Sequence, residues 1–338
     1  MTLILLQPDQ LPASEADLRA AAPGPGHRQL ARQLAGAGAR GDTLERLRTL
    51  PSFLNGTGAP APHREYQDTE IPYDYDEPLR EYDAFFGVGR TARPVDGMFG
   101  QSLFVAYRSL IEEGLGSGTR LSWAQWSALC ATFHAVISLV TGTEPGPAAL
   151  PVAEPPLLRW HMDPHRRWRV GHHAFFALTQ SLIVALNCFR SARRSGDGGL
   201  AREMLRLAAR LLDASAAAFV FTGEFSCAQY QTQVRPSMAP PAVADGFSGL
   251  LSPDHRYLVR LLGALRPQLR DLPPELAPDH RSFTAALERA YEAHKYVCAR
   301  FGGDRSASLR MSEASTASAV DVVHGLKLAR TRLVGLPR

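Results

Sequence analysis

The sequence predicts an all-α protein, a helical bundle with long irregular loops. Two observations support this prediction: apolar residues recur every three or four positions through most of the chain, and almost no segment alternates like a strand. With 338 residues, of which 45% are apolar and 21% charged, the chain is long enough to bury a large core. We therefore expect a globular protein.

The helical spacing defines eight segments, and proline-rich or glycine-rich stretches separate them. The predicted helices are residues 26–50, 101–116, 122–141, 166–193, 200–222, 253–270, 280–301 and 317–334. Residues 63–83 (HREYQDTEIPYDYDEPLREYD) and 141–156 (TGTEPGPAALPVAEPP) cannot continue a helix and are predicted loops. This pattern divides the chain into an N-terminal helical and loop region, residues 1–100, that covers the core, and a main helical domain, residues 101–338.

Composition excludes several classes of protein. The net charge of +4 comes almost wholly from arginines, which form no continuous basic face, so no nucleic-acid partner is expected. No run of 18 apolar residues and no signal-peptide pattern occurs, which predicts a cytoplasmic protein without a membrane partner. The four cysteines are too scattered for a secreted disulfide framework, and the GxxxxGK[ST], GxGxxG, HExxH and GxSxG motifs are absent.

The stretch AYEAHKYVCARFGG, residues 290–303, places His294 and Cys298 one helical turn apart. Its helix is expected to begin with a cap at Asp279 or Ser282 and to end at Gly302. Its buried stripe is predicted to contain Phe283, Leu287, Ala290, Tyr291, His294, Cys298 and Phe301. Side chains at i and i+4 have Cβ atoms about 5–6 Å apart, so this pair faces one region of the interior.

Three structures fit this spacing. One helix can offer an imidazole to a haem iron while its thiol forms a thioether with a vinyl group at the rim, although the usual attachment motif is CxxCH. The pair also fits a core histidine bonded to a carbonyl beside a buried thiol. A tetrahedral zinc site has less support, because no CxxC or second His–Cys cluster is near.

A second histidine begins another apolar stripe. Ser252 is a predicted N-cap and Pro253 the first helical residue, so His255 falls in the first turn. The positive end of the helix dipole favours its neutral, metal-binding form. A surface histidine at a helix start is the alternative.

The pattern HxnHxxxC formed by these residues resembles the haem-dependent aromatic oxygenases, which include tryptophan and indoleamine 2,3-dioxygenases and bacterial tyrosine hydroxylases. SPDHRYL resembles their PxHRxFL segment, and ALERAYEAHKYVC resembles the helix with their proximal histidine. The cysteine one turn later is typical of the 3-methyl-L-tyrosine hydroxylase group of saframycin-type tetrahydroisoquinoline pathways. The resemblance covers roughly residues 165–335 and implies the dioxygenase-like helical fold, with residues 101–338 as a haem-binding catalytic domain.

The resemblance also implies the roles of individual residues. His294 is the expected axial ligand of the iron, Cys298 the single thioether of a c-type haem, and His255 the second iron ligand, which must leave before an oxidant binds. GHHAFFALTQSL resembles the helix with the distal histidine, and QTQVRP resembles the segment whose arginine holds the substrate carboxylate. These likenesses assign a catalytic acid–base role to His173 and substrate binding to Arg235.

Two of these assignments have alternatives. Sequence separation favours His173 as the distal group, whereas the stripe of Phe175 and Thr179 suits His172 as the inward residue. Either histidine also fits a hydrogen-bonded core position, and Arg235 also fits a surface or loop-bridging position.

The activity implied is hydroxylation of 3-methyl-L-tyrosine ortho to its hydroxyl, giving 3-hydroxy-5-methyl-L-tyrosine, with hydrogen peroxide or O2 as oxidant, in antibiotic biosynthesis. The alternatives are a tyrosine hydroxylase or an indole-type dioxygenase of the same superfamily, and a non-enzymatic bis-histidine haem protein. The GTGGS loop of tryptophan dioxygenases is absent after the proximal helix, which disfavours tryptophan ring cleavage. A homo-oligomer is compatible with the sequence.

Overall fold

The computed structural model describes residues 2–35, 42–48, 75–91, 97–143, 153–159, 161–244, 247–302 and 318–335, and it confirms the all-α prediction. The helices are α1 (Glu15–Ala20), α2 (Pro25–Ala35), α3 (Asp42–Arg48), α4 (Glu77–Phe85), α5 (Met98–Ser117), α6 (Trp123–Thr141), α7 (Pro164–Ser195), α8 (Gly198–Thr222), α9 (Cys227–Gln229), α10 (Arg235–Ser237), α11 (Pro253–Arg270), α12 (Ala277–Arg300) and α13 (Ala319–Val334). The strands are β1 (Leu3–Leu6) and β2 (Val88–Thr91).

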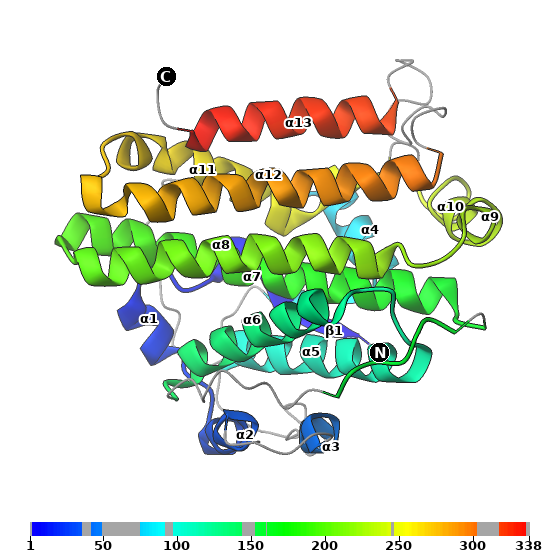
Figure 1. The fold of residues 1–338 in the computed structure, drawn as a ribbon, viewed down its shortest axis with the longest axis horizontal. Helices are drawn as coiled ribbons and strands as arrows, with labels where there is room; N and C mark the ends of the chain where they lie inside the picture. The colour runs from blue at the N-terminus through cyan, green and yellow to red at the C-terminus, as the bar shows by residue number, and fades with distance from the viewer. Residues whose placement is uncertain are drawn as a thin grey trace.

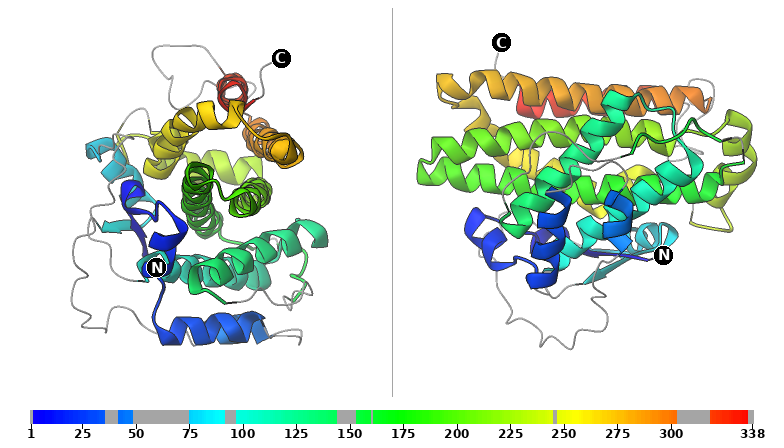
Figure 2. Two further views of the ribbon diagram at one scale, coloured as in Figure 1. Left: turned by 90° about the vertical axis from the view of Figure 1, so that its left-hand side faces the viewer. Right: turned by 60° about the horizontal axis from the view of Figure 1, so that its bottom comes forward.

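The helices are stacked in layers around the central pair α7 and α8 (Figure 1). Helix α12 packs along α8, α11 packs on α7, and α13 covers both α11 and α12. On the other side, α5 and α6 pack on α7 and α8, and α2 and α3 form the outermost layer (Figure 2). One continuous apolar core joins these layers, from Leu3 to Val334.

From residue 98 onward, every predicted helix is found with its ends shifted by three residues or fewer. The predicted helix 26–50 contains two helices, α2 and α3, with residues 36–41 and 49–50 outside the described part of the chain. The loop predicted for residues 63–83 is wrong at its end, where Asp76 caps α4 and Pro78 lies in the first turn. The two short parallel strands were not predicted, because Leu3–Leu6 is apolar throughout and does not alternate with polar residues.

Local capping explains where the helices near the centre begin and end. As predicted, Ser252 caps α11: its hydroxyl accepts from the His255 N–H at 3.4 Å. The predicted cap of α12 at Asp279 or Ser282 is wrong, because this helix begins at Ala277 after a 3₁₀ turn and has no side-chain cap. Its predicted end is confirmed, since Gly302 has φ of 83°, a left-handed conformation that glycine adopts without a steric penalty.

A buried arginine connects the N-terminal strands to the helical layers. The Arg90 side chain in β2 is 1% exposed and donates to Asp83 of α4 at 2.5 Å and to Asp254 of α11 at 2.6 Å. Its guanidinium also donates to the Leu6 carbonyl, and Gln180 of α7 donates to both that carbonyl and Asp254. This network joins five elements and satisfies two carboxylates that would otherwise be buried without partners.

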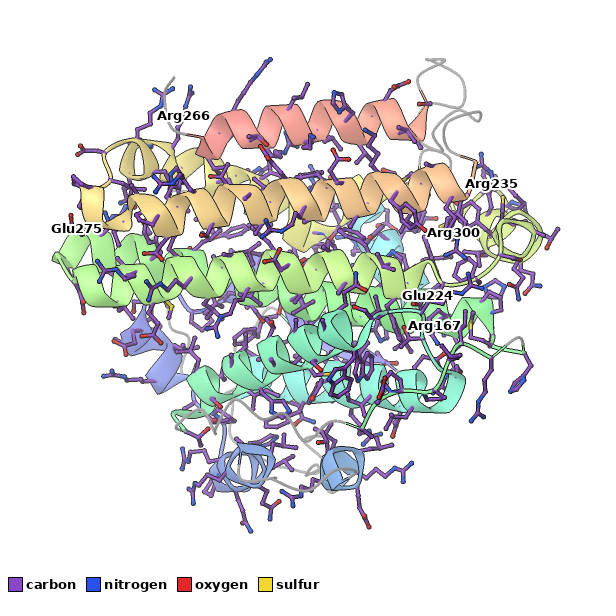
Figure 3. All side chains as sticks on the ribbon, in the orientation of Figure 1. Arg167, Glu224, Arg235, Arg266, Glu275 and Arg300 are labelled. Carbon is purple, nitrogen blue, oxygen red and sulfur yellow. The ribbon has the colours of Figure 1, made fainter. Side chains whose placement is uncertain are left out.

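A second buried network connects α5, α7 and the end of α8. Arg167 is fully buried and donates to Glu113 at 3.2 Å and to Glu224 at 2.9 Å, with its guanidinium 4.0 Å from the centre of the Phe221 ring (Figure 3). The Glu224 carboxylate also accepts from Thr119 and from the Arg120 N–H. The turn after α8 is therefore fixed to the body of the bundle.

Helices α6 and α7 are long and apolar enough to cross a membrane. In this fold 89% of the apolar window of α7 and 56% of that of α6 are buried inside the bundle. Core packing therefore accounts for their apolar character.

We expect Arg90→Met to lower the free energy of unfolding by about 3–5 kcal/mol, because it leaves two buried carboxylates without their cation. The matched control is Arg289→Met, which removes an exposed pair with Asp213 and should cost less than about 1 kcal/mol. Urea midpoints of the two variants test this difference. Equal shifts would show that the buried network does not hold the strands to the helices.

Candidate functional site

A cavity of about 280 Å³ lies between α7, α8, α11, α12 and α13, and the end of α4 closes one side. Most of its wall is apolar, with contributions from Phe86, Phe175, Phe219, Leu262 and Leu287. Among the described residues that line it, none is aspartate, glutamate or lysine. Its polar groups are hydroxyls, three imidazoles, the Trp168 indole N–H, one thiol and one guanidinium.

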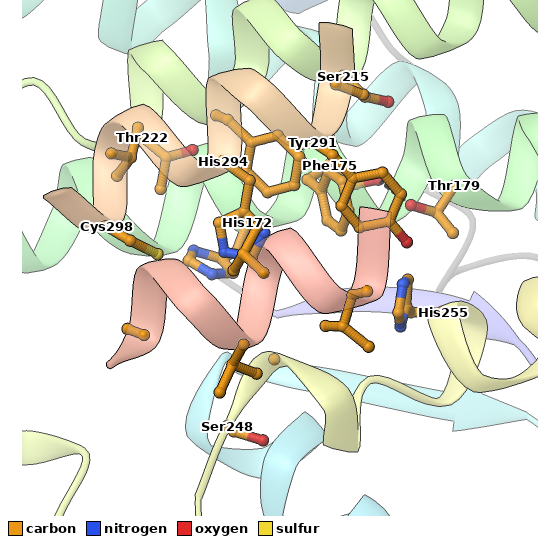
Figure 4. A pocket seen from close by; sticks show the side chains of 18 of the residues that line it. His172, Phe175, Thr179, Ser215, Thr222, Ser248, His255, Tyr291, His294 and Cys298 are labelled. Carbon is orange, nitrogen blue, oxygen red and sulfur yellow. Dashed lines mark hydrogen bonds between the residues drawn. The ribbon is translucent and has the colours of Figure 1, made fainter. Parts of the chain in front are cut away.

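His294 and Cys298 both face this cavity from α12, as their spacing predicts (Figure 4). The His294 ring stacks on Phe219 of α8, with ring centres 4.7 Å apart and planes 5° apart. Burial raises the pKa of the Cys298 thiol to about 11, so the group is a neutral thiol near pH 7. The predicted buried stripe of α12 is confirmed in part: Phe283, Leu287, Ala290 and Phe301 are buried, whereas Tyr291, His294 and Cys298 are half-buried and line the cavity.

His255 reaches the cavity from the first turn of α11. Burial lowers the pKa of both His255 and His294 to about 4, so both rings are neutral near pH 7. Neither ring makes a hydrogen bond to a described residue. Two neutral imidazoles from different helices are therefore available to a ligand inside the cavity.

The structure places His172, and not His173, at the cavity. The His172 Nδ1–H donates to the Trp168 carbonyl at 2.7 Å, which leaves Nε2 with its lone pair, and burial lowers the pKa of the ring to about 3. His173 is 3% exposed and donates from Nε2 to the Phe86 carbonyl at 2.6 Å. The expectation that His173 is the distal group is therefore corrected. Side chains of adjacent residues in a helix point about 100° apart, and the apolar stripe of α7 correctly indicated that His172 faces inward.

Arg235 lines the cavity at the end nearest the turn after α8, as substrate binding requires. It follows a single π-helical turn, Tyr230–Val234, a local irregularity that is frequent at functional sites. Burial raises the pKa of Tyr230, and the positive charge of Arg235 opposes this rise. The role of Arg235 as a carboxylate clamp stays a prediction.

Sequence reasoning missed two aromatic residues of this end of the cavity. Trp168 lies one turn before His172, with ring centres 4.4 Å apart, and Tyr230 stacks on Phe301 at 4.2 Å. Trp168, His172 and Phe175 are spaced three or four residues apart and therefore share one face of α7. This spacing could have predicted that Trp168 faces the cavity. Tyr230 lies in a π turn, which has no such signal.

The donor set favours a haem over a bare ion. Calcium and magnesium require oxygen ligands, and the described cavity wall offers no carboxylate. The described residues also contain no group of three or more His, Cys, Asp or Glu side chains arranged to hold one metal ion, as a zinc site would need. A haem brings four ring nitrogens of its own and needs only axial imidazoles and an apolar wall, which this cavity has.

Comparisons with known proteins agree on one group. A family model described as SfmD 3-methyl-L-tyrosine peroxygenase matches residues 4–279. A 3-methyl-L-tyrosine peroxygenase from Streptomyces lavendulae is 32% identical over 263 residues, which cover 77% of this chain and 72% of the relative. A crystal structure of reduced SfmD, soaked with sodium hydrosulfite, superposes with a TM-score of 0.68 at 28% identity and covers 87% of this chain and 96% of that chain.

Acid should destabilise the protein partly through His173. Its folded-state pKa of about 4 lies below the ordinary 6.5, so the unfolded chain binds a proton at a higher pH than the folded chain does. The stabilisation is complete above about pH 6.5 and is lost as the pH falls towards 4. We expect His173→Gln, whose amide can still donate to the Phe86 carbonyl, to reduce the shift in urea midpoint between these two pH values.

The control for this measurement is His324→Gln on the exposed face of α13, which should leave the shift unchanged. A His173 variant with the same pH dependence as the parent protein would contradict the low pKa of His173.

Proposed function

Because the chain belongs to the family of SfmD 3-methyl-L-tyrosine peroxygenases, we propose that its cavity is the active site of a peroxide-using enzyme that hydroxylates 3-methyl-L-tyrosine. The match to the family model over most of the chain carries this conclusion. The protein is thus an oxidoreductase acting on an aromatic amino acid. We further propose that the new hydroxyl enters ortho to the phenol oxygen, giving 3-hydroxy-5-methyl-L-tyrosine for antibiotic biosynthesis, in the cytoplasm.

A haem is the cofactor that fits both the activity and the wall of the cavity. His294 would bind its iron, His255 would be the second iron ligand at rest, and Cys298 would form the thioether to the ring. When bound, a haem supplies the activation of peroxide and the transfer of its oxygen atom to the substrate ring. Burial favours this arrangement, because it keeps both imidazoles neutral and able to coordinate.

His172 is the proposed acid–base residue. Its Nδ1–H is held by the Trp168 carbonyl, so its Nε2 can accept a proton from peroxide and return it to the departing oxygen. The ring is also held by stacking on Phe86, with centres 4.2 Å apart. These two contacts hold the orientation of the His172 ring, and His173 supports the same wall through its bond to the Phe86 carbonyl.

Arg235 is the proposed partner of the substrate carboxylate. A guanidinium can bind both carboxylate oxygens at once, which would hold the amino-acid end near Tyr230 and direct the ring into the cavity. The apolar walls from α8, α11 and α12 exclude water and favour the methyl-bearing ring.

The haem-reconstituted protein should convert 3-methyl-L-tyrosine with hydrogen peroxide to a product heavier by one oxygen atom. Mass spectrometry measures the product, and parallel reactions with tyrosine and tryptophan test the related activities. Absence of the hydroxylated product with all three substrates, in a protein that binds haem, would refute the proposed function.

The two neighbouring histidines provide matched variants for this assay. His172→Gln should lower kcat/KM about 100-fold or more, because it removes the acid–base group. His173→Gln should leave kcat/KM within a few-fold of the parent value, because His173 contributes to stability and does not touch the reacting atoms.

We expect Cys298→Ser to abolish covalent haem attachment while His294 still binds haem. Intact mass after acid–acetone extraction measures this: the parent protein should retain the mass of one haem and the variant should not. Cys227→Ser is the control, because Cys227 is an exposed thiol outside the cavity. Retention of haem by the Cys298 variant would show that the tether is elsewhere.

A further inference from the structure

One face of helix α13 closes the cavity, and a charged residue follows on the same face. Its cavity-lining side chains are Ala319, Val322, Val323 and Leu326. Arg330 lies four residues after Leu326, and therefore one turn further along the same face. Arg330 thus lies one helical turn beyond the cavity-lining residues of α13.

Arg330 lies beside two residues of the cavity wall. Its positive charge lowers the pKa of His255 and opposes the rise that burial causes in the pKa of the Tyr291 hydroxyl. Both residues line the cavity, and Figure 4 shows Tyr291 and His255 on the same side of it. Arg330 therefore lies next to the cavity wall, hydrogen-bonded to Tyr291 and close enough to His255 to act on it electrostatically.

The guanidinium lacks an anionic partner within the described part of the chain. No salt bridge joins Arg330 to a described carboxylate, and its Nε is buried without a hydrogen-bond partner. By contrast, Lys327 on the same helix binds Glu292 at 2.6 Å. Arg330 as a whole is half-buried and is hydrogen-bonded to Tyr291, but its Nε–H has no acceptor, and an arriving anion would supply one.

We propose that Arg330 and the Tyr291 hydroxyl form a carboxylate-binding site at the α13 side of the cavity. This inference rests on the proposed function, which brings three carboxylates to the site: two haem propionates and the carboxylate of the amino acid. Among the described lining residues, Arg235 is the only cationic side chain, so one arginine cannot neutralise all three. The shared chemistry is a carboxylate held by a guanidinium and a phenol hydroxyl.

The test separates the two sources of the carboxylate with matched variants, Arg330→Gln and Arg332→Gln. Arg332 lies on the same helix and is exposed, and its substitution removes the same charge. One arm measures binding of haemin and of haemin dimethyl ester to the apoprotein by quenching of tryptophan fluorescence. The other arm measures binding of 3-methyl-L-tyrosine and of its amide to the haem-loaded protein by calorimetry.

If the partner is a propionate, Arg330→Gln weakens haemin binding about tenfold or more and leaves the dimethyl ester unaffected. If the partner is the substrate, the same variant weakens binding of the amino acid by that factor and leaves its amide unaffected. Arg330→Lys should restore part of the affinity in either case, and Arg332→Gln should match the parent protein.

Unchanged affinities for haemin and for the amino acid, in a folded Arg330→Gln variant, would overturn the proposal. Equal weakening of a carboxylate ligand and its neutral analogue would also overturn it, because that result indicates only a structural role through Tyr291. Neither outcome depends on turnover. A failed hydroxylation assay with normal ligand binding would refute the proposed function and leave the carboxylate site supported.

Discussion

The buried pairing of Arg90 with Asp83 and Asp254 is the constraint on which the site depends. Its three charged side chains are 1% exposed or less, so each is stable only while the other two are in place. Asp254 immediately precedes His255, and the pairing therefore fixes the first turn of α11 and the direction of that imidazole. A strand at the start of the chain thus contributes to the geometry of a cavity formed by later helices.

Burial acts on the cavity in two ways. Burial removes the apolar stripes of α7, α8, α11 and α12 from water. It also lowers the pKa of each imidazole that faces the interior. The histidines of this wall are therefore neutral under ordinary conditions, as proton acceptors and metal ligands must be. The absence of carboxylates from the described wall strengthens this effect, since no anion nearby would favour the charged rings.

His172 and His173 show how neighbouring residues acquire different roles. One ring faces the cavity, with its tautomer set by the Trp168 carbonyl, while the other binds the Phe86 carbonyl and supports the end of α4. The family assignment is independent of this detail, because the matched residues 4–279 contain both histidines and end before His294 and Cys298. The roles of those last two residues depend on the helix geometry and on the proposed haem.

Sequence patterns alone predicted the long helices, the stripe of α12 with His294 and Cys298, and the position of His255 in a capped first turn. These features follow from helical periodicity and local capping, which involve residues close together in the chain. The tertiary structure was needed to show which of His172 and His173 faces the cavity, and that Tyr230 and Trp168 complete one end of it. Those placements depend on contacts between helices far apart in the sequence, and a rotation of one residue in a helix changes the face presented by about 100°.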